Sequence, residues 1–144
     1  MEIMETFLSR SRKETSKLAK ILAKEILRYK TKIKTALIFG LTGELGSGKT
    51  TFIQGFAKGL GIKKRLTSPS FVLMKKYKNV YHIDCYRIKN PKDIRSLDFP
   101  EIISNPKNIV LIEWAEKIKS ILPKNTIWVR FRISGETKRE IVMK

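Results

Sequence analysis

Residues 43–50 carry the pattern with the clearest chemistry in this chain. Their sequence, GELGSGKT, fits the phosphate-binding loop G-x-x-x-x-G-K-[ST]. Glycines let such a loop curve tightly, so that successive backbone N–H groups point inward at an anion. The spacing predicts that Lys49 reaches the β- and γ-phosphates of a nucleotide and that the Thr50 hydroxyl binds Mg²⁺. The predicted nucleotide-binding residues of this motif are Gly43, Glu44, Leu45, Gly46, Ser47, Gly48, Lys49, Thr50 and Thr51.

Two carboxylates are candidate ligands of the metal ion that accompanies a bound nucleotide. Glu113 follows the apolar run 109–112, which is typical of a strand buried on both faces of a parallel sheet. The carboxyl end of such a strand is where ligands bind, although a solvated glutamate at a strand end is the simpler alternative. Asp84 shares one face of a predicted strand with His82 and Tyr86. That face is either part of the site or the polar side of a half-exposed hairpin, and His82 receives no catalytic role.

These residues define a predicted site with two overlapping sets. The catalytic set is Lys49, Asp84 and Glu113, and the metal ligands are Thr50, Asp84 and Glu113. A phosphate loop needs a second acidic group for its metal, which is why the carboxylates complete the motif.

The elements around the loop occur in the order that a phosphate loop requires. The apolar run 35–42 precedes it and predicts a buried strand. Apolar residues at helical spacing follow it, and Gly61 is placed to end that helix. An earlier helix begins at the capping box of Ser11 and Glu14 and ends near Tyr29.

Further strands and helices alternate in the second half of the chain. The expected elements are strands at 71–77 and 80–88 joined by a turn at 78–79, a weak helix at 94–103, a strand at 109–112, a short helix at 115–122 and a last strand at 126–133. This alternation predicts an α/β fold. We expect a P-loop NTPase-like three-layer fold with a mostly parallel central sheet and a β-hairpin insertion, forming one P-loop ATPase domain over residues 1–144.

The composition of the chain indicates which cellular compartment and which partners to expect. No apolar run approaches the length of a membrane span, and no signal peptide opens the chain. The lone Cys85 cannot form an internal disulfide, so we expect a cytoplasmic protein without a membrane partner. The net charge of +18 favours a polyanion such as RNA. However, 31 − 9 = 22 of the basic residues are lysine, which a lysine-rich composition would also produce.

Four motifs together resemble one family. They are GELGSGKTTF at 43–52, SPSF at 68–71, HIDCYR at 82–87 and LIEW at 111–114. Their order and spacing over about residues 11–133 resemble the TsaE family, small bacterial ATPases required for making threonylcarbamoyladenosine in tRNA. The resemblance implies that residues 68–70 form a switch loop. It also implies that Ser11 and Thr15 lie near the adenine.

The same resemblance implies a mode of action. The expected cofactors are ATP and Mg²⁺, and the expected activity is a Mg-dependent ATPase of low intrinsic rate. Because no arginine is clearly aimed at the γ-phosphate, we expect activation by partners of the TsaB and TsaD type, with tRNA contacted indirectly or weakly. Two alternatives are a small-molecule kinase and a nucleotide-dependent binding module. The chain departs from the family pattern at Ser70, Cys85, Asp98 and Ala115, where threonine, leucine, glycine and proline are usual.

Overall fold

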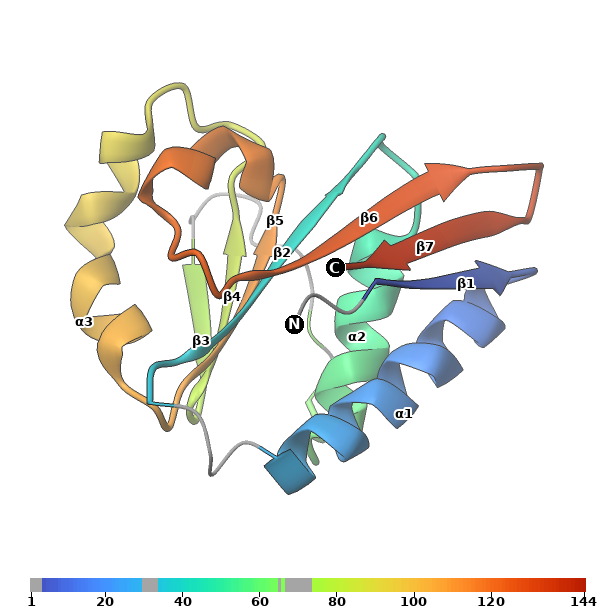
Figure 1. The fold of residues 1–144 in the computed structure, drawn as a ribbon, viewed down its shortest axis with the longest axis horizontal. Coiled ribbons are helices and arrows are strands. Elements are labelled where there is room, and N and C mark those ends of the chain that lie inside the picture. The colour runs from blue at the N-terminus through green and yellow to red at the C-terminus, as the bar shows by residue number, and fades with distance from the viewer. Residues whose placement is uncertain (1–3, 30–33, 65, 67–73) are drawn as a thin grey trace. The chain divides into compact units, whose positions relative to one another are not determined.

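A computed structural model describes residues 4–29, 34–64, 66 and 74–144 (Figure 1). The chain divides into two compact units. The first contains Met1–Lys32, Gly43–Thr67 and Val129–Lys144, and the second contains Ile33–Thr42 and Ser68–Trp128. The expected switch loop at 68–70 lies outside the described residues, as does the start of the expected strand at 71–77. A single ATPase domain over residues 1–144 stays a prediction.

Two helices of the first unit lie side by side, α1 (Arg12–Tyr29) and α2 (Lys49–Gly59) (Figure 1). They approach closely because Gly55 and Gly59 of α2 have no side chain. A Cβ atom at either position would clash with the backbone of α1, at Ser16 and Lys20 respectively. This contact holds the middle and the end of α2 against a long neighbouring helix.

The ends of these helices follow the sequence prediction. At the start of α1 the Glu14 N–H donates to Ser11 Oγ over 3.1 Å. The Glu14 carboxylate in turn accepts from the Arg10 N–H over 2.6 Å, one residue earlier than a standard capping box. After α2, Gly61 has a φ of +86° and its N–H donates to the Lys58 carbonyl, which confirms it as the residue that ends the helix.

Three antiparallel strands complete the first unit: β1 (Glu5–Ser9), β7 (Arg139–Met143) and β6 (Ile127–Ile133), in the order β1-β7-β6. The prediction that the strand at 126–133 is the last one was therefore wrong, and β1 was missed. Both strands escaped prediction because they are mostly exposed: Ser9 is the one buried residue of β1, and Ile141 is the one buried residue of β7. Neither strand shows the alternation of apolar and polar residues by which strands are recognised.

The second unit contains four strands in the order β2-β5-β4-β3, which are β2 (Leu37–Gly43), β5 (Ile109–Glu113), β4 (Val80–Asp84) and β3 (Met74–Tyr77). The β2–β5 and β5–β4 pairs are parallel, and every residue of β5 is buried. The α/β class and the parallel central strands are thus confirmed. The last residue of β2, Gly43, is also the first residue of the phosphate loop.

The predicted hairpin exists, but its second strand is shorter than expected. Strands β3 and β4 are antiparallel and joined at Lys78, which has a φ of +57°. Strand β4 ends at Asp84 and not at residue 88. Its residues from Val80 to Ile83 point to alternate faces and are all buried, so the interpretation of one face as half exposed was wrong.

Short helical segments follow β4 and β5 in the second unit. They are η2 (Pro91–Leu97), α3 (Phe99–Ser104) and η3 (Ala115–Ile121), where η denotes a 3₁₀ helix. The helix expected at 94–103 is therefore two segments, which are separated at Asp98 by a left-handed φ of +56°. Ile94, Phe99 and Ile118 pack into the buried core of this unit together with Ile83 and Ile112 of the strands. The core thereby anchors the loops that follow the strand ends.

Candidate functional site

The phosphate loop connects β2 to α2 and depends on three glycines. Gly43, Gly46 and Gly48 have φ values of +147°, +78° and +106°, a conformation that L side chains rarely adopt. Gly43 is also crowded, because a Cβ atom there would lie 2.6 Å from the Phe131 carbonyl oxygen and 2.8 Å from Ser47 Oγ. The glycine spacing of the motif is therefore a requirement of the observed backbone.

The buried polar groups of this loop fit a phosphate. The Lys49 side chain is buried at the start of α2, and its ammonium group donates to the carbonyls of Gly43 and Glu44. The Ser47 hydroxyl is buried and has no hydrogen-bond partner among the described residues. A phosphate oxygen is an acceptor that would satisfy this hydroxyl, and the Lys49 charge would balance it.

The remaining motif residues form the rim of the loop. The Ser47 N–H donates to the Glu44 carbonyl over 3.1 Å, which closes a turn at the loop tip. Leu45 projects from that turn and is 76% exposed. Thr50 and Thr51 are half-buried in the first turn of α2. The Thr50 hydroxyl therefore comes from the helix end, where the motif places it.

Arg139 of β7 contacts the loop and was not among the predicted site residues. Its Nη2 donates to the Gly46 carbonyl over 3.1 Å, and its Nη1 donates to the carbonyls of Gly135 and Lys138 over 3.0 and 2.8 Å. An anion-binding loop turns its N–H groups inward, so a cation on a carbonyl supports the loop from outside. The sequence supported no more than a guess about Arg139, because the chain past Ile133 matches the family pattern weakly and β7 itself was missed.

The structure places Thr15 and Ser11, the two residues expected near the adenine, in different roles. Thr15 is buried, and its Oγ1 lies 2.6 Å from Ser9 Oγ, within hydrogen-bonding distance. A Cβ atom at Gly48 would lie 3.9 Å from the Thr15 methyl carbon, so Thr15 packs beside the loop. The Ser11 hydroxyl instead accepts from the Glu14 N–H at the start of α1. The structure therefore brings Thr15 to the loop and uses Ser11 as a helix cap.

In the second unit, the two candidate carboxylates lie next to each other. Asp84 and Glu113 are register partners at the last positions of the adjacent parallel strands β4 and β5. The Asp84 Oδ1 accepts from the Tyr86 N–H over 3.0 Å, which orients this carboxylate. Glu113 is 3% exposed, so the alternative of a solvated strand-end glutamate was wrong.

His82 contacts one of these carboxylates, although the sequence analysis gave it no role. It is fully buried, and its Nε2 lies 2.7 Å from Glu113 Oε2. Its Nδ1 has no hydrogen-bond partner in the described part of the chain. His82 lies two residues before Asp84 on the same strand. Its contact with Glu113 could have been predicted only by pairing this strand with the strand that ends in Glu113.

The described residues contain no group of three or more His, Cys, Asp and Glu side chains that could hold a metal ion by itself. A metal ion bound by Asp84 and Glu113 would need further ligands. This suits Mg²⁺, which keeps several water ligands and binds through one or two carboxylates together with phosphate oxygens.

A cation and two aromatic rings brace the turns that follow the carboxylates. The Lys117 ammonium donates to the Tyr86 carbonyl and lies 5.2 Å from the Tyr86 ring centroid and 5.8 Å from that of Trp114. The two rings are 5.2 Å apart, and Trp114 has a left-handed φ of +56°. Tyr86 follows Asp84 and Trp114 follows Glu113, so this cluster links the two strand ends.

Cys85 lies between these groups but is chemically inert. Burial, followed by the charge of the neighbouring Asp84 carboxylate, raises the pKa of the Cys85 thiol to about 12. The thiolate is the nucleophile and the metal ligand of cysteine chemistry, so a thiol with this pKa serves neither purpose near neutral pH. Cys85 is part of the core, as the sequence indicated.

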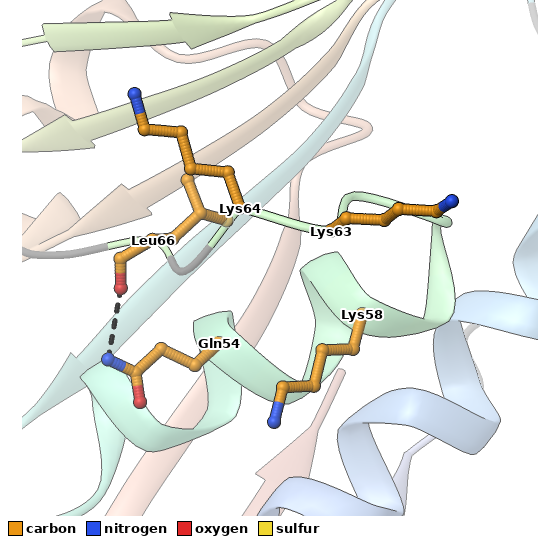
Figure 2. A pocket seen from close by; sticks show the side chains of 5 residues that line it. All are labelled: Gln54, Lys58, Lys63, Lys64 and Leu66. Carbon is orange, nitrogen blue, oxygen red and sulfur yellow. Dashed lines mark hydrogen bonds between the residues drawn. The ribbon is translucent and has the colours of Figure 1, made fainter.

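A basic groove of about 250 Å³ lies beyond the loop in the first unit, lined by Gln54, Lys58, Lys63, Lys64 and Leu66 (Figure 2). The Gln54 amide donates to the Leu66 carbonyl over 2.9 Å and closes one side. The three ammonium groups point away from one another in Figure 2. Because a small anion needs donors that converge, this groove is not a preformed phosphate site.

A strand, a glycine loop and a helix, with carboxylates at the ends of parallel strands, define an α/β protein of the P-loop type. The model of the family described as "Threonylcarbamoyl adenosine biosynthesis protein TsaE" matches residues 9–141. The chain belongs to the TsaE family. No helix in the described ranges is long and apolar enough to cross a membrane.

Several relatives named tRNA threonylcarbamoyladenosine biosynthesis protein TsaE are similar to this chain. The protein of Rickettsia prowazekii is 38% identical over 134 residues, covering 90% of this chain and 87% of its own. That of Bacillus subtilis is 36% identical over 108 residues, covering 72% of this chain and 66% of its own. The crystal structure of Bacillus subtilis YdiB has a TM-score of 0.75 at 29% identity, covering 99% of this chain and 86% of that one.

Proposed function

We propose that this chain is a Mg-dependent ATPase that supports the threonylcarbamoyl modification of adenosine in tRNA. It acts in the cytoplasm through a complex with partners of the TsaB and TsaD type. Membership of the TsaE family and the names of its relatives support the pathway. The main support for ATP binding is the phosphate loop, in which Lys49 is buried and three glycines have positive φ values. The Ser47 hydroxyl of this loop has no hydrogen-bond partner among the described residues.

The loop residues bind and orient the triphosphate. Backbone N–H groups and the start of α2 hold the phosphate oxygens, and the Lys49 ammonium moves from loop carbonyls to the β- and γ-phosphates. This exchange replaces a hydrogen bond to a neutral carbonyl by one to an anion, which is stronger. Thr15 packs beside the loop and, with Ser11, forms the side that receives the adenine.

Thr50, Asp84 and Glu113 are the proposed ligands of Mg²⁺, directly or through water. When bound, the ion would neutralise charge on the β- and γ-phosphates. The His82 imidazole and the Tyr86 N–H hold the carboxylates of Glu113 and Asp84 in fixed orientations. Lys49, Asp84 and Glu113 thus form the proposed catalytic set.

We expect slow hydrolysis by the isolated protein. Arg139 lies at the loop, but its guanidinium group donates to four backbone carbonyls. Arg132 of β6 pairs with Glu140 over 2.9 Å. A γ-phosphate arginine raises the rates of related enzymes by about 10³–10⁵-fold. A partner would supply or order such a group, which explains why turnover would depend on it.

ATP affinity, measured by isothermal titration calorimetry with Mg²⁺, tests the binding step. Removing a charged hydrogen-bond donor costs about 1.5–3 kcal/mol, so Lys49→Ala should weaken binding by about 10- to 100-fold. Lys58→Ala is the matched control, since Lys58 is exposed in the last turn of the same helix. Equal affinities of a folded Lys49→Ala protein and the wild type would refute the proposed site.

Phosphate release tests whether partners activate hydrolysis. It is measured for the isolated protein and for the protein mixed with purified TsaB- and TsaD-type proteins. We expect low turnover alone and a clear increase with the partners. Fast turnover without partners would contradict the proposal, and phosphoryl transfer to a small acceptor would indicate a kinase instead.

A further inference from the structure

Lys117 connects the two turns that follow the candidate metal ligands. It lies in η3, four residues after Glu113, and it is half-buried. Its ammonium group donates to the carbonyl of Tyr86, two residues after Asp84. Its backbone N–H donates to the carbonyl of Trp114 over 3.1 Å. The side chain of Lys117 therefore reaches the turn after β4, while its backbone closes the turn after β5.

The turn after β5 is strained. Trp114 has a left-handed φ of +56°, which a residue with a bulky side chain rarely adopts. Such a conformation persists only where the surrounding contacts hold it, and it is frequent at functional sites. The Lys117 ammonium lies over the Trp114 ring, 5.8 Å from its centroid, and the Tyr86 ring centroid lies 5.2 Å from the same point. These contacts fix the direction in which the chain leaves Glu113.

The turn after β4 depends on the same ammonium group. The Tyr86 N–H donates to Asp84 Oδ1 over 3.0 Å and so orients the Asp84 carboxylate. Between these two residues, the Cys85 N–H donates to the Glu113 carbonyl over 3.0 Å and joins the strand ends. Because Lys117 holds the Tyr86 carbonyl, loss of the ammonium group would release the turn that orients Asp84.

We propose that Lys117 is a positioning residue for Asp84 and Glu113 as ligands of Mg²⁺. The assignment of Mg²⁺ to these carboxylates rests on the proposed function. Mg²⁺ demands near-ideal octahedral geometry, so a displaced carboxylate binds it less well. An ammonium group has no acceptor for a metal ion, so Lys117 acts through the two turns that it connects.

The positive charge of Lys117 by itself would have the opposite effect. Burial and the charges of Asp84 and Glu116 raise the pKa of the Cys85 thiol, whereas the Lys117 charge lowers it, so this charge acts at the strand end. A cation near a metal site repels Mg²⁺, and its removal would strengthen Mg²⁺ binding. Removal of a positioning group would weaken that binding. The sign of the change therefore separates positioning from charge repulsion.

The experiment compares Lys117→Met with Lys119→Met in the full chain. Methionine keeps a long unbranched side chain and removes the ammonium group. Lys119 is the matched control, because it lies in the same 3₁₀ helix with its ammonium group 5.8 Å from the Trp128 ring centroid. Both variants carry a formal charge of 18 − 1 = +17. Urea unfolding verifies that both are folded.

A third variant, Lys117→Arg, tests for rescue. The guanidinium group also donates hydrogen bonds and stacks on aromatic faces. We expect Lys117→Arg to recover most of the wild-type behaviour in each measurement.

The first measurement is calorimetric titration with ATP, in EDTA and at several Mg²⁺ concentrations. In EDTA all variants should bind ATP with equal affinity, because the phosphate loop is unchanged. Lys117→Met should need about 3- to 10-fold more Mg²⁺ to reach half of the metal-dependent gain in ATP affinity, since it loses one charged hydrogen bond at a partly exposed site. The requirement of Lys119→Met should change by less than about twofold.

The second measurement is amide hydrogen exchange by NMR, without nucleotide or metal. It reports on the two turns directly and does not depend on ATP hydrolysis. The Cys85 and Tyr86 amides should exchange about 3- to 10-fold faster in Lys117→Met, because the turns that contain their hydrogen bonds open more often. Lys119→Met should leave both rates unchanged.

Three results would overturn this role of Lys117. They are a Mg²⁺ requirement of Lys117→Met that is equal to or lower than that of the wild type, an equal increase in Lys119→Met, and unchanged exchange of both amides. Absence of ATP binding by the wild type would refute the proposed ATPase. The exchange rates would then decide by themselves whether Lys117 holds the two turns.

Discussion

The buried imidazole of His82 lies 2.7 Å from the carboxylate of Glu113, Nε2 to Oε2. Their side chains are 0% and 4% exposed, so water does not solvate either group well. An ionised carboxylate can only accept hydrogen bonds, and a buried one is costly without a donor. His82 therefore orients Glu113, and it makes a buried charge possible at the end of β5.

Substitution of His82 tests this relationship. We expect His82→Leu to lower the free energy of unfolding by about 1–3 kcal/mol, because the buried Glu113 carboxylate loses its contact with the imidazole. ATP turnover should fall as well, whereas His82→Gln, which keeps a donor, should retain part of both. Urea unfolding and phosphate release measure the two effects.

The double variant His82→Leu/Glu113→Leu tests whether the loss of stability in His82→Leu comes from the buried Glu113 carboxylate. Replacing both members of a buried pair by apolar residues is often neutral for stability. Stability should therefore recover relative to His82→Leu, while turnover should not. Unchanged stability and turnover in His82→Leu alone would show that the contact has no role.

Arg139 is expected to support the phosphate loop. Arg139→Gln removes the charged donor to the Gly46 carbonyl, so ATP affinity should fall by about tenfold. The matched control is Arg132→Gln, since Arg132 lies on the adjacent strand and pairs with Glu140 at the surface. Calorimetric titration measures both. Equal affinities of the two variants would remove Arg139 from the site.

Cys85 gives a pH dependence of defined sign. Its pKa is raised from 9.0 to about 12, chiefly by burial, so the native state keeps the thiol protonated where the unfolded chain ionises. Its contribution to stability is complete below pH 9 and is lost as pH rises from 9 to 12. Wild-type stability should fall by up to about 1.4 kcal/mol per pH unit more than that of Cys85→Val. Urea unfolding from pH 7 to 11 measures this, and parallel curves would contradict it.

Asp98 is expected to be a strained position. Its φ of +56° suits glycine better, and its side chain makes no capping hydrogen bond. Asp98→Gly should raise the free energy of unfolding by about 0.5–1 kcal/mol, and the melting temperature by a few degrees. Asp98→Ala keeps the strain and should bring no gain. A lower melting temperature for Asp98→Gly would show that Asp98 contributes an interaction that outweighs the strain.

The sequence by itself determined the features that depend on local chemistry. The spacing of Gly43, Lys49 and Thr50 predicts the phosphate loop, because the required backbone conformations need glycine at defined positions. The capping residues of α1 and Gly61 after α2 act within a few residues, so their patterns were sufficient. The unbroken apolar run before Glu113 likewise predicted a strand buried on both faces.

Tertiary structure decided which distant residues meet. The contacts of His82 with Glu113 and of Arg139 with Gly46 depend on strand pairing and on a loop packing against β7. Local patterns carry no information about such partners, since the same residue types occur on solvated faces. Burial also depends on neighbours, and Ile83 of β4 is buried in a core to which Ile94, Phe99 and Ile118 contribute from separate segments. Residue chemistry is therefore local, whereas contact and burial arise only when separate segments of the chain pack together.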